Sequence, residues 1–395
     1  MAVAGMAFVP RIVAAEASGG KGPTRKIRMG VVGGGFGADF FWHLDPNSEV
    51  VAVSDLIPER RGHLKKVYKC DKAYDSLEQL ILDKDVDAVA IFTGAPDHVR
   101  HAVACMKEGK HVVSAVPAAT ELEDAQLLLD TVKKTGLTYM MAETSYYHQE
   151  AISVRHMYQN GEFGRIMYTE AEYLHPGLEA LWFDKDGKST WRHGAPPMHY
   201  PTHMTAFVIG ITGERLTDVS CLGWTDDSPL FKGNKYGNNF WNEVGLFSTS
   251  KGNSMRAIYI KRGACRGVER AQWYGEKMSF FSQDPRGIGP VIMRAGSVTE
   301  KDDGGFIRTL APMENYDQPQ YWKTDLLPKS LRFDSGHGQS QTFLTHEFID
   351  ALVNNRVPTV NIYEALAMTV PGIVAHESAM RGGERLKIPS FDPKA

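Results

Sequence analysis

A glycine-rich turn near the N-terminus constrains the fold of this chain more than any other segment. An apolar run at 27–32 leads into Gly33-Gly34-Gly35-Phe36-Gly37-Ala38, and we expect a helix at 39–44. Gly33, Gly35 and Ala38 occupy the small-residue positions of G-x-G-x-x-G/A, which allow a tight turn, close approach of a pyrophosphate, and packing of a helix on a strand. The pattern predicts the start of a dinucleotide-binding unit.

An acidic residue after the second apolar run strengthens this prediction. The run at 50–54 ends in Asp55, where an acid would accept hydrogen bonds from an adenosine ribose. Arg60 and Arg61 follow closely and could tolerate a 2′-phosphate, but the carboxylate would repel one. We therefore expect NAD, with NADP as the lesser alternative. The competing interpretation is an ordinary glycine turn beside a surface acid.

Strands and helices then alternate as far as residue 143. Strands are expected at 88–93, 111–115 and 139–143, with helices at 97–108 and 122–135, which predicts a doubly wound parallel sheet. Ligands of such sheets bind beyond the carboxyl ends of the strands. This rule places at the mouth of the cofactor site Gly94, Pro96, His98, Val116, Pro117, Glu143 and, just beyond, His148.

From residue 146 the pattern changes to one rich in β-strands. After a helix at 150–158, runs at 166–175, 216–224, 242–248, 255–261 and 270–281 predict a large, open, mainly antiparallel sheet. Amphipathic segments at 340–354 and 363–381 and a strand at 386–391 close the chain, while 285–331 resists assignment. The predicted fold is α/β, with a Rossmann domain at 26–145 and a second α/β domain at 146–395, whose last helices could pack back on the first.

Composition excludes several other classes. The 44 basic and 47 acidic side chains give a net charge of −3, and no basic cluster suggests nucleic-acid binding. The four cysteines lie far apart without a CxxC pair, so we expect buried free thiols rather than disulfides or a zinc ribbon. No apolar run reaches the ~18 residues of a membrane-spanning helix.

The first 25 residues look like the end of an export signal followed by a linker. Ala15-Glu16-Ala17 fits the A-x-A pattern of a signal-peptidase site. We therefore expect a periplasmic protein, exported by a folded-protein route because NAD would have to be acquired before export. The alternative is a disordered arm on a cytoplasmic protein.

The motifs of the first half resemble those of the Gfo/Idh/MocA family. The resemblance rests on Gly33 to Ala38, Asp55, Thr93-Gly94-Ala95-Pro96-Asp97-His98 and Gly109-Lys110-His111-Val112. It implies a nicotinamide cofactor, a sugar or polyol substrate, and a homo-oligomer formed through the open sheet. The family's dehydrogenases usually carry a lysine after the fifth strand to polarise the reacting hydroxyl, but here Val116 stands at that position.

The departures from that pattern resemble a branch of NAD-dependent glycosidases typified by α-N-acetylgalactosaminidases. The matching segments are Val116-Pro117-Ala118-Ala119, Met140-Met141-Ala142-Glu143, Tyr173-Leu174-His175 and Tyr200-Pro201-Thr202-His203. The resemblance implies oxidation of a sugar at C3, elimination of the C1 substituent, addition of water, and reduction on the same NAD. The alternatives are a net sugar or polyol dehydrogenase and a non-catalytic nucleotide-binding protein.

The resemblance implies four acid/base candidates. His203 with Tyr200 and Tyr173 with His175 are the two candidate catalytic pairs, and histidine suits proton transfer because its ordinary pKa of about 6.5 lies near working pH. Glu143 would orient sugar hydroxyls or the nicotinamide ribose. Each tyrosine could instead be a packing aromatic, and His175 a structural histidine.

Further side chains are candidate sugar contacts. They are His148, Trp191, Arg192, His199 and His337. Trp191, together with Trp182, could stack on a pyranose ring or belong to the core, and His337 lies in a glycine-rich loop that could be an ordinary turn. His199 and His203 have the spacing of zinc ligands on one helix face, but no glutamate completes H-E-x-x-H, so we expect no metal.

Overall fold

The computed structural model describes residues 25–284, 286–296, 299–301, 304–305, 307–309 and 312–393. The predicted export signal therefore lies almost wholly outside the described residues. Within them, no helix is both long and apolar enough to cross a membrane.

The first half forms the predicted parallel sheet. Six strands lie in the order β3-β2-β1-β4-β5-β6, and all neighbours are parallel. The strands are β1 Ile27–Val32, β2 Ser48–Ser54, β3 Ala73–Tyr74, β4 Ala88–Ile91, β5 His111–Ser114 and β6 Tyr139–Met141, and the connecting helices are α1 Pro58–Tyr68, α2 Leu77–Leu80, α3 His98–Lys107 and α4 Leu122–Thr135. The central strand β4 is buried throughout, as expected for a sheet covered on both faces.

The helix expected at 39–44 is wrong. Two short 3-10 turns, η1 Phe36–Asp39 and η2 Trp42–Leu44, replace it, and Phe41 between them has a left-handed φ of 56°. The rings of Phe40 and Trp42 stack with centroids 6.0 Å apart, and Phe40 also packs on Phe92 at 4.3 Å. Residues two apart point to different sides of an α-helix, so burial of both rings in one cluster favours the irregular path.

The second half forms a nine-stranded sheet in the order β16-β13-β12-β11-β7-β10-β9-β8-β17. Its strands are β7 Ile166–Leu174, β8 Leu216–Trp224, β9 Asn242–Thr249, β10 Ser254–Ile260, β11 Val268–Gly275, β12 Met278–Phe281, β13 Val291–Arg294, β16 Met313–Asn315 and β17 Leu386–Lys387. All neighbours are antiparallel except β7 and β10. The open, mainly antiparallel sheet is thus confirmed.

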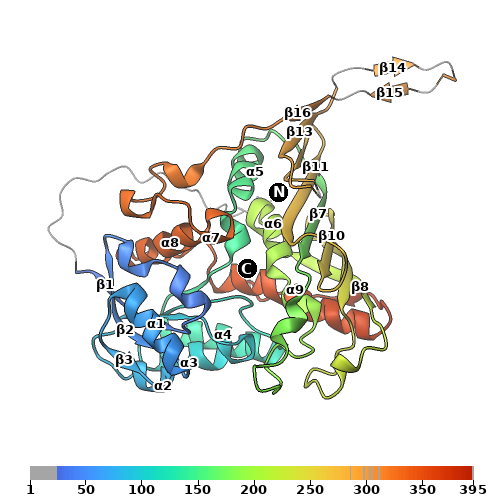
Figure 1. Ribbon diagram of the computed structural model, residues 1–395. Helices are drawn as coiled ribbons and strands as arrows, with labels where there is room; N and C mark the ends of the chain where they lie inside the picture. Colours follow the sequence, from blue (N-terminus) through green and yellow to red (C-terminus); the bar gives the residue numbers. More distant parts are fainter. Residues whose placement is uncertain are drawn as a thin grey trace, which may run out of the picture.

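Three details of this sheet differ from the sequence prediction. The run at 270–281 is a hairpin of two strands, β11 and β12, rather than one strand. The final strand ends at Lys387, because Pro389 lacks the amide needed to continue pairing. Part of the unassigned segment extends the sheet as β13 and β16, while β14 Thr299–Lys301 and β15 Ile307–Thr309 form a hairpin that projects from the body (Figure 1).

Helices cover one face of the open sheet and join it to the first domain (Figure 1). Helices α6 Thr202–Thr212 and α9 Ile362–Met380 pack on its strands, α5 Gln149–Gln159 packs on α6, and α8 Gln341–Val353 lies against β1 of the first domain. Helix α9 packs on α4, β6 and β8, so it touches both sheets. Just before it, the Met141 amide of β6 donates to the Val360 carbonyl at 3.0 Å. The last quarter of the chain therefore packs against the nucleotide-binding sheet.

The cysteines form no disulfide. Cys70, Cys105 and Cys221 are buried free thiols, whereas Cys265 is partly exposed, contrary to the expectation that all four are buried. Cys265 lies in the loop after β10, where no helix covers the chain.

Candidate functional site

The glycine turn after β1 leaves its middle residue facing open space. A Cβ added at Gly33 would lie 2.3 Å from the Phe92 carbonyl oxygen, and one at Gly37 would lie 2.9 Å from the Phe92 ring. A Cβ at Gly35 would meet nothing within 4 Å. The outer glycines thus pack against the end of β4, while Gly35 offers bare backbone to a ligand. This arrangement fits the pyrophosphate of a dinucleotide.

Asp55 lies beside the glycine turn, at the end where the adenosine of a dinucleotide would bind. Its Oδ2 accepts a hydrogen bond from the Gly34 amide at 2.6 Å, and its Oδ1 accepts one from the Ile57 amide at 2.8 Å. Each carboxylate oxygen keeps a second lone pair for a ribose hydroxyl. The Arg61 guanidinium is bound by Asp75 at 2.8 Å and by the Asp55 carbonyl, so it is not free for a 2′-phosphate. These contacts favour NAD over NADP.

The predicted mouth residues converge at the ends of β4 and β5, with different contacts. The His98 ring is buried, with Nδ1 2.8 Å from the Pro117 carbonyl oxygen and Nε2 3.1 Å from that of Thr93. It therefore holds two loops together rather than facing a ligand. Val116 is also buried, and Pro96 is partly exposed. A Cβ at Gly94 would lie 2.8 Å from the Trp191 indole, so this tryptophan covers the mouth.

Two carboxylates flank His203 at the start of α6. The His203 Nδ1 donates to Glu143 Oε1 at 2.9 Å and lies 3.8 Å from Glu269 Oε2. Ser145 connects the two acids, because its amide donates to Glu143 at 2.8 Å and its hydroxyl donates to Glu269 at 2.7 Å. Glu143 thus orients a histidine through Oε1, while its buried Oε2 has no hydrogen-bond partner among the described residues, so its contact with a sugar or ribose stays a prediction.

This arrangement makes His203 a cation at neutral pH. Burial alone would lower its pKa, but the charges of Glu143 and Glu269 outweigh burial and raise the pKa to about 9. Burial would raise the pKa of both acids, and the neighbouring imidazolium lowers them instead. No hydrogen bond joins His203 Nε2 to a residue in the described part of the chain. That N–H is available to a substrate oxygen.

Glu269 is the functional residue that sequence analysis missed. It lies on β11, where its register partner on β7 is Tyr173. A glutamate in an alternating strand ordinarily faces solvent, so only the pairing of β11 with β7 reveals its position. Had the pairing of β11 with β7 been known, Glu269 could have been identified as the register partner of Tyr173, the first residue of the Y-x-H motif.

The other predicted catalytic residues surround His203. The Tyr173 ring lies 4.8 Å from the His203 ring, 5.7 Å from that of His175 and 6.4 Å from that of Tyr200. Burial raises the pKa of both tyrosines, so each is a neutral hydroxyl. Burial lowers the pKa of His175, which is therefore an uncharged base at pH 7. Tyr173 and Tyr200 therefore contact His203, whereas His175 contacts Tyr173 and lies at the solvent-exposed side of the group.

Two more histidines join the cluster from the nucleotide side. The His148 Nε2 lies 3.5 Å from Glu269 Oε2. His337, in the short turn α7 Gly336–Gln339, packs 4.8 Å from the ring of Phe36 in the glycine turn, and burial lowers its pKa. The loop before α8 thus links the cofactor cradle to the cluster.

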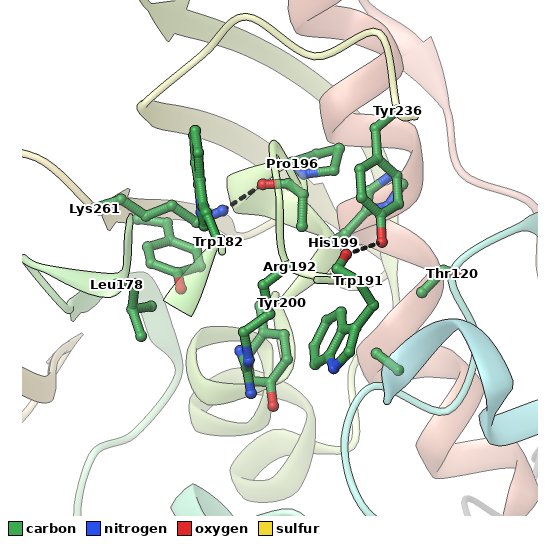
Figure 2. A pocket seen from close by; sticks show the side chains of 13 residues that line it. Thr120, Leu178, Trp182, Trp191, Arg192, Pro196, His199, Tyr200, Tyr236 and Lys261 are labelled. Atoms are coloured by element: carbon green, nitrogen blue, oxygen red, sulfur yellow. Dashed lines mark hydrogen bonds between the residues drawn. The ribbon is translucent and has the colours of Figure 1, made fainter. Parts of the chain in front are cut away.

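A hollow of about 460 Å³, partly open to solvent, lies beside this cluster (Figure 2). Its aromatic walls are Trp182, Trp191, Tyr200, Tyr236 and Tyr259, and its basic side chains are Arg192, His199 and Lys261. Two of these walls also contact the cluster around His203: the Tyr200 ring lies 5.4 Å from the His203 ring, and the Tyr259 ring lies 4.7 Å from the Tyr173 ring. The predicted sugar contacts Trp191, Arg192 and His199 therefore share one pocket.

His199 and His203 do not form a metal site together. The His199 ring lies 5.2 Å from that of His376, whose Nδ1 pairs with Glu243 at 2.7 Å, whereas His203 pairs with Glu143. Burial lowers the pKa of His199 to about 3. Among the described residues, no cluster of three or more histidine, cysteine or acidic side chains could hold a metal ion.

Two protein-family models match the chain. Residues 27–143 match the Gfo/Idh/MocA oxidoreductase family with an NAD-binding Rossmann fold, and residues 306–394 match the C-terminal domain of glycosyl hydrolase 109. The second match includes the loop that carries His337.

Curated relatives and solved structures agree with these matches. A glycosyl hydrolase family 109 protein of Solibacter usitatus is 26% identical over 407 residues, covering 93% of this chain and 89% of its own. Glycosyl hydrolase family 109 protein 1 of Bacteroides fragilis is 32% identical over 169 residues, which are 40% of this chain and 36% of that protein. A levoglucosan dehydrogenase solved with NADH has the same fold, with a TM-score of 0.76 at 17% identity over 93% of this chain and all of that one. The chain therefore joins an NAD-binding domain of the Gfo/Idh/MocA oxidoreductase family to a C-terminal domain of the glycosyl hydrolase 109 type.

Proposed function

We propose that the protein is a carbohydrate-active enzyme that cleaves glycosides by a redox-assisted route on a retained NAD. The observation that carries this proposal is a cationic histidine, His203, held by two carboxylates, with a second, uncharged histidine, His175, in contact with the same Tyr173 ring. Elimination and water addition across a sugar ring require an acid and a base at once, whereas a net dehydrogenase requires only a base. The full-length likeness to a protein named glycosyl hydrolase family 109 supports the same activity.

Different residues of the cofactor site bind different parts of the dinucleotide. Gly35 gives bare backbone to the pyrophosphate, and Asp55 accepts from the ribose. A nicotinamide bound there would supply reversible hydride chemistry at a sugar carbon, so the net reaction would be the addition of water across the glycosidic bond.

The residues around His203 perform the proton transfers. The Nε2–H of His203 donates to a sugar or leaving-group oxygen, while Glu143 and Glu269 hold the ring in place and keep it charged. His175 accepts a proton from the sugar. The neutral hydroxyls of Tyr173 and Tyr200 donate hydrogen bonds that orient the sugar ring. Positioned acid/base groups typically accelerate such steps by about 10²- to 10⁴-fold.

The test is an isotope experiment on purified protein without added NAD. Aryl α- and β-glycosides are incubated in deuterated water while aglycone release, NADH absorbance and deuterium in the sugar are followed, with His203→Gln as the inactive control. We expect aglycone release with deuterium at C2 and no accumulation of NADH. Reduction of added NAD by free sugars, without cleavage of any glycoside, would make the protein a net sugar dehydrogenase instead.

A further inference from the structure

The hollow beside the catalytic group has an uneven charge. Arg192 and Lys261 line it from a loop and from the end of β10, and no aspartate or glutamate lines it. Pockets for neutral sugars need acceptors as well as donors, because each hydroxyl both donates and accepts. A wall with two cations and no carboxylate favours a ligand that brings its own negative charge.

Lys261 is a buried amine without a carboxylate partner. Its side chain is almost wholly buried, and its ammonium donates to the Ala195 carbonyl and lies 5.4 Å from the centre of the Tyr259 ring. Glu243, whose charge acts on Lys261, is already bound by the Met198 amide at 2.7 Å and by His376. No carboxylate in the described ranges forms an ion pair with Lys261. Burying a charge without a partner costs several kcal/mol, and an anion bound beside the ammonium would offset this cost.

Arg192 is also without an acidic partner. Its guanidinium lies 4.2 Å above the Trp191 ring, and no aspartate or glutamate of the described segments lies within ion-pair distance. Figure 2 shows Lys261 beside Trp182, with its ammonium bonded to a backbone carbonyl, and Arg192 beside Tyr200. A planar guanidinium suits a carboxylate, and a lysine adds a point charge.

We propose that the hollow binds the anionic group of an acidic sugar, with Lys261 and Arg192 as its counter-ions and the tryptophan and tyrosine walls against the ring. This substrate class rests on the proposed function, because the hollow opens onto the same catalytic group. The shared chemistry is a singly charged oxyanion, which a uronate carboxylate or a sulfate ester could supply.

The pH dependence of binding follows from the groups that face Lys261. They are Glu243 on β9, Arg192 and His199 on the loop before α6, and Tyr259 on the same strand. Burial and Arg192 lower the pKa of Lys261 to about 7, against the opposing charge of Glu243. An anion binds best to the protonated lysine, so its affinity falls as the pH rises through about 7.

The experiment measures binding, not turnover. The NAD-loaded protein is titrated calorimetrically with glucuronate against glucose, galacturonate against galactose, and glucose 6-sulfate. We expect an acidic sugar to bind about tenfold more tightly than its neutral partner on the acid side of the Lys261 pKa. Lys261→Met should remove most of this preference, while Lys134→Met, which removes one exposed charge from α4, should keep it.

The outcomes separate this proposal from the one on which it rests. An acidic preference that persists in Lys261→Met, equal binding of acidic and neutral sugars, or binding of neither would overturn the assignment. In the native protein, a fall in acidic-sugar affinity with rising pH, absent for the neutral sugar, supports it even if Lys261→Met does not fold. An acidic preference without glycoside cleavage would refute only the redox-assisted route. The carboxylate and sulfate arms show which oxyanion is preferred.

Discussion

The charge of His203 depends on Glu269, so replacing that acid with its neutral isostere should change the titration of the histidine. Glu269 Oε2 lies 3.8 Å from His203 Nδ1; His203 is buried, and the Glu269 side chain is 16% exposed. At an effective dielectric constant of about 20, unit charges at this separation attract each other by ~4 kcal/mol. Raising a pKa from 6.5 to about 9 corresponds to ~3.4 kcal/mol, so the attraction by Glu269 is comparable with the whole shift. Glu269→Gln should therefore lower the pKa of His203 most of the way back to 6.5, while the amide oxygen of the glutamine still accepts a hydrogen bond from the Ser145 hydroxyl.

The assay is an NMR titration of histidine labelled at Cε1. The His203 resonance is assigned by its absence from the His203→Gln spectrum. In Glu269→Gln we expect its midpoint to move from about 9 toward 6.5. Glu276→Gln, which removes a partly exposed carboxylate beyond the end of β11, is the matched control and should leave the midpoint unchanged. An unchanged midpoint in Glu269→Gln, or one already near 6.5 in the native protein, would refute the reasoning.

Four further outcomes can be measured. His203→Gln should reduce turnover by about 10²-fold or more in a steady-state assay, and unchanged turnover would remove His203 from the mechanism. Because the pKa of His203 is raised in the folded state, protonation of this residue stabilises the fold. The stabilisation is complete below about pH 6.5 and is lost as the pH rises through about 9, so the free energies of unfolding of the native and His203→Gln proteins, measured in urea, should converge there. Gly33→Ala, with φ of +101° and a clash at 2.3 Å, should lower the free energy of unfolding by ~1–3 kcal/mol, whereas Gly35→Ala should keep the melting temperature but lose bound NAD, as measured by cofactor content after gel filtration. Leu246, 58% exposed on β9, lies on the outer face of the open sheet, so Leu246→Lys should dissociate the predicted homo-oligomer in light scattering; a native monomer would contradict that prediction.

The cofactor cradle could be predicted because its determinants lie close together in the sequence. Gly33, Gly35 and Asp55 belong to one unit of two strands joined by a short connection, and the φ of Gly33 and the room at Gly35 are local backbone properties. The helix expected after the turn was wrong because Phe92, distant in sequence, draws Phe40 out of helical geometry. Local pattern predicts an element only where distant packing agrees with it.

The acid/base group was only partly predictable. Tyr173, Tyr200 and His203 belong to sequence motifs, but Glu269 lies at an ordinary position in β11, where alternation indicates only a face, and Lys261 directly follows β10. Ser145 and Glu269 are 124 residues apart in the chain, and only the register of β11 on β7 brings them within hydrogen-bond distance. Electrostatics that depend on cross-strand pairing cannot be read from spacing alone.

The contact of residues 360–361 with β6 affects how this protein can be made. β6 is the outermost strand of the nucleotide-binding sheet, and its free edge is covered by the Val360 carbonyl and a bridge from Met140 to Asn361. During synthesis, that edge stays open until nearly the whole chain has left the ribosome. An exposed edge strand is a template for pairing with other chains, so nascent or truncated forms ending before residue 360 should aggregate. The nucleotide-binding domain is therefore completed last, although it is translated first.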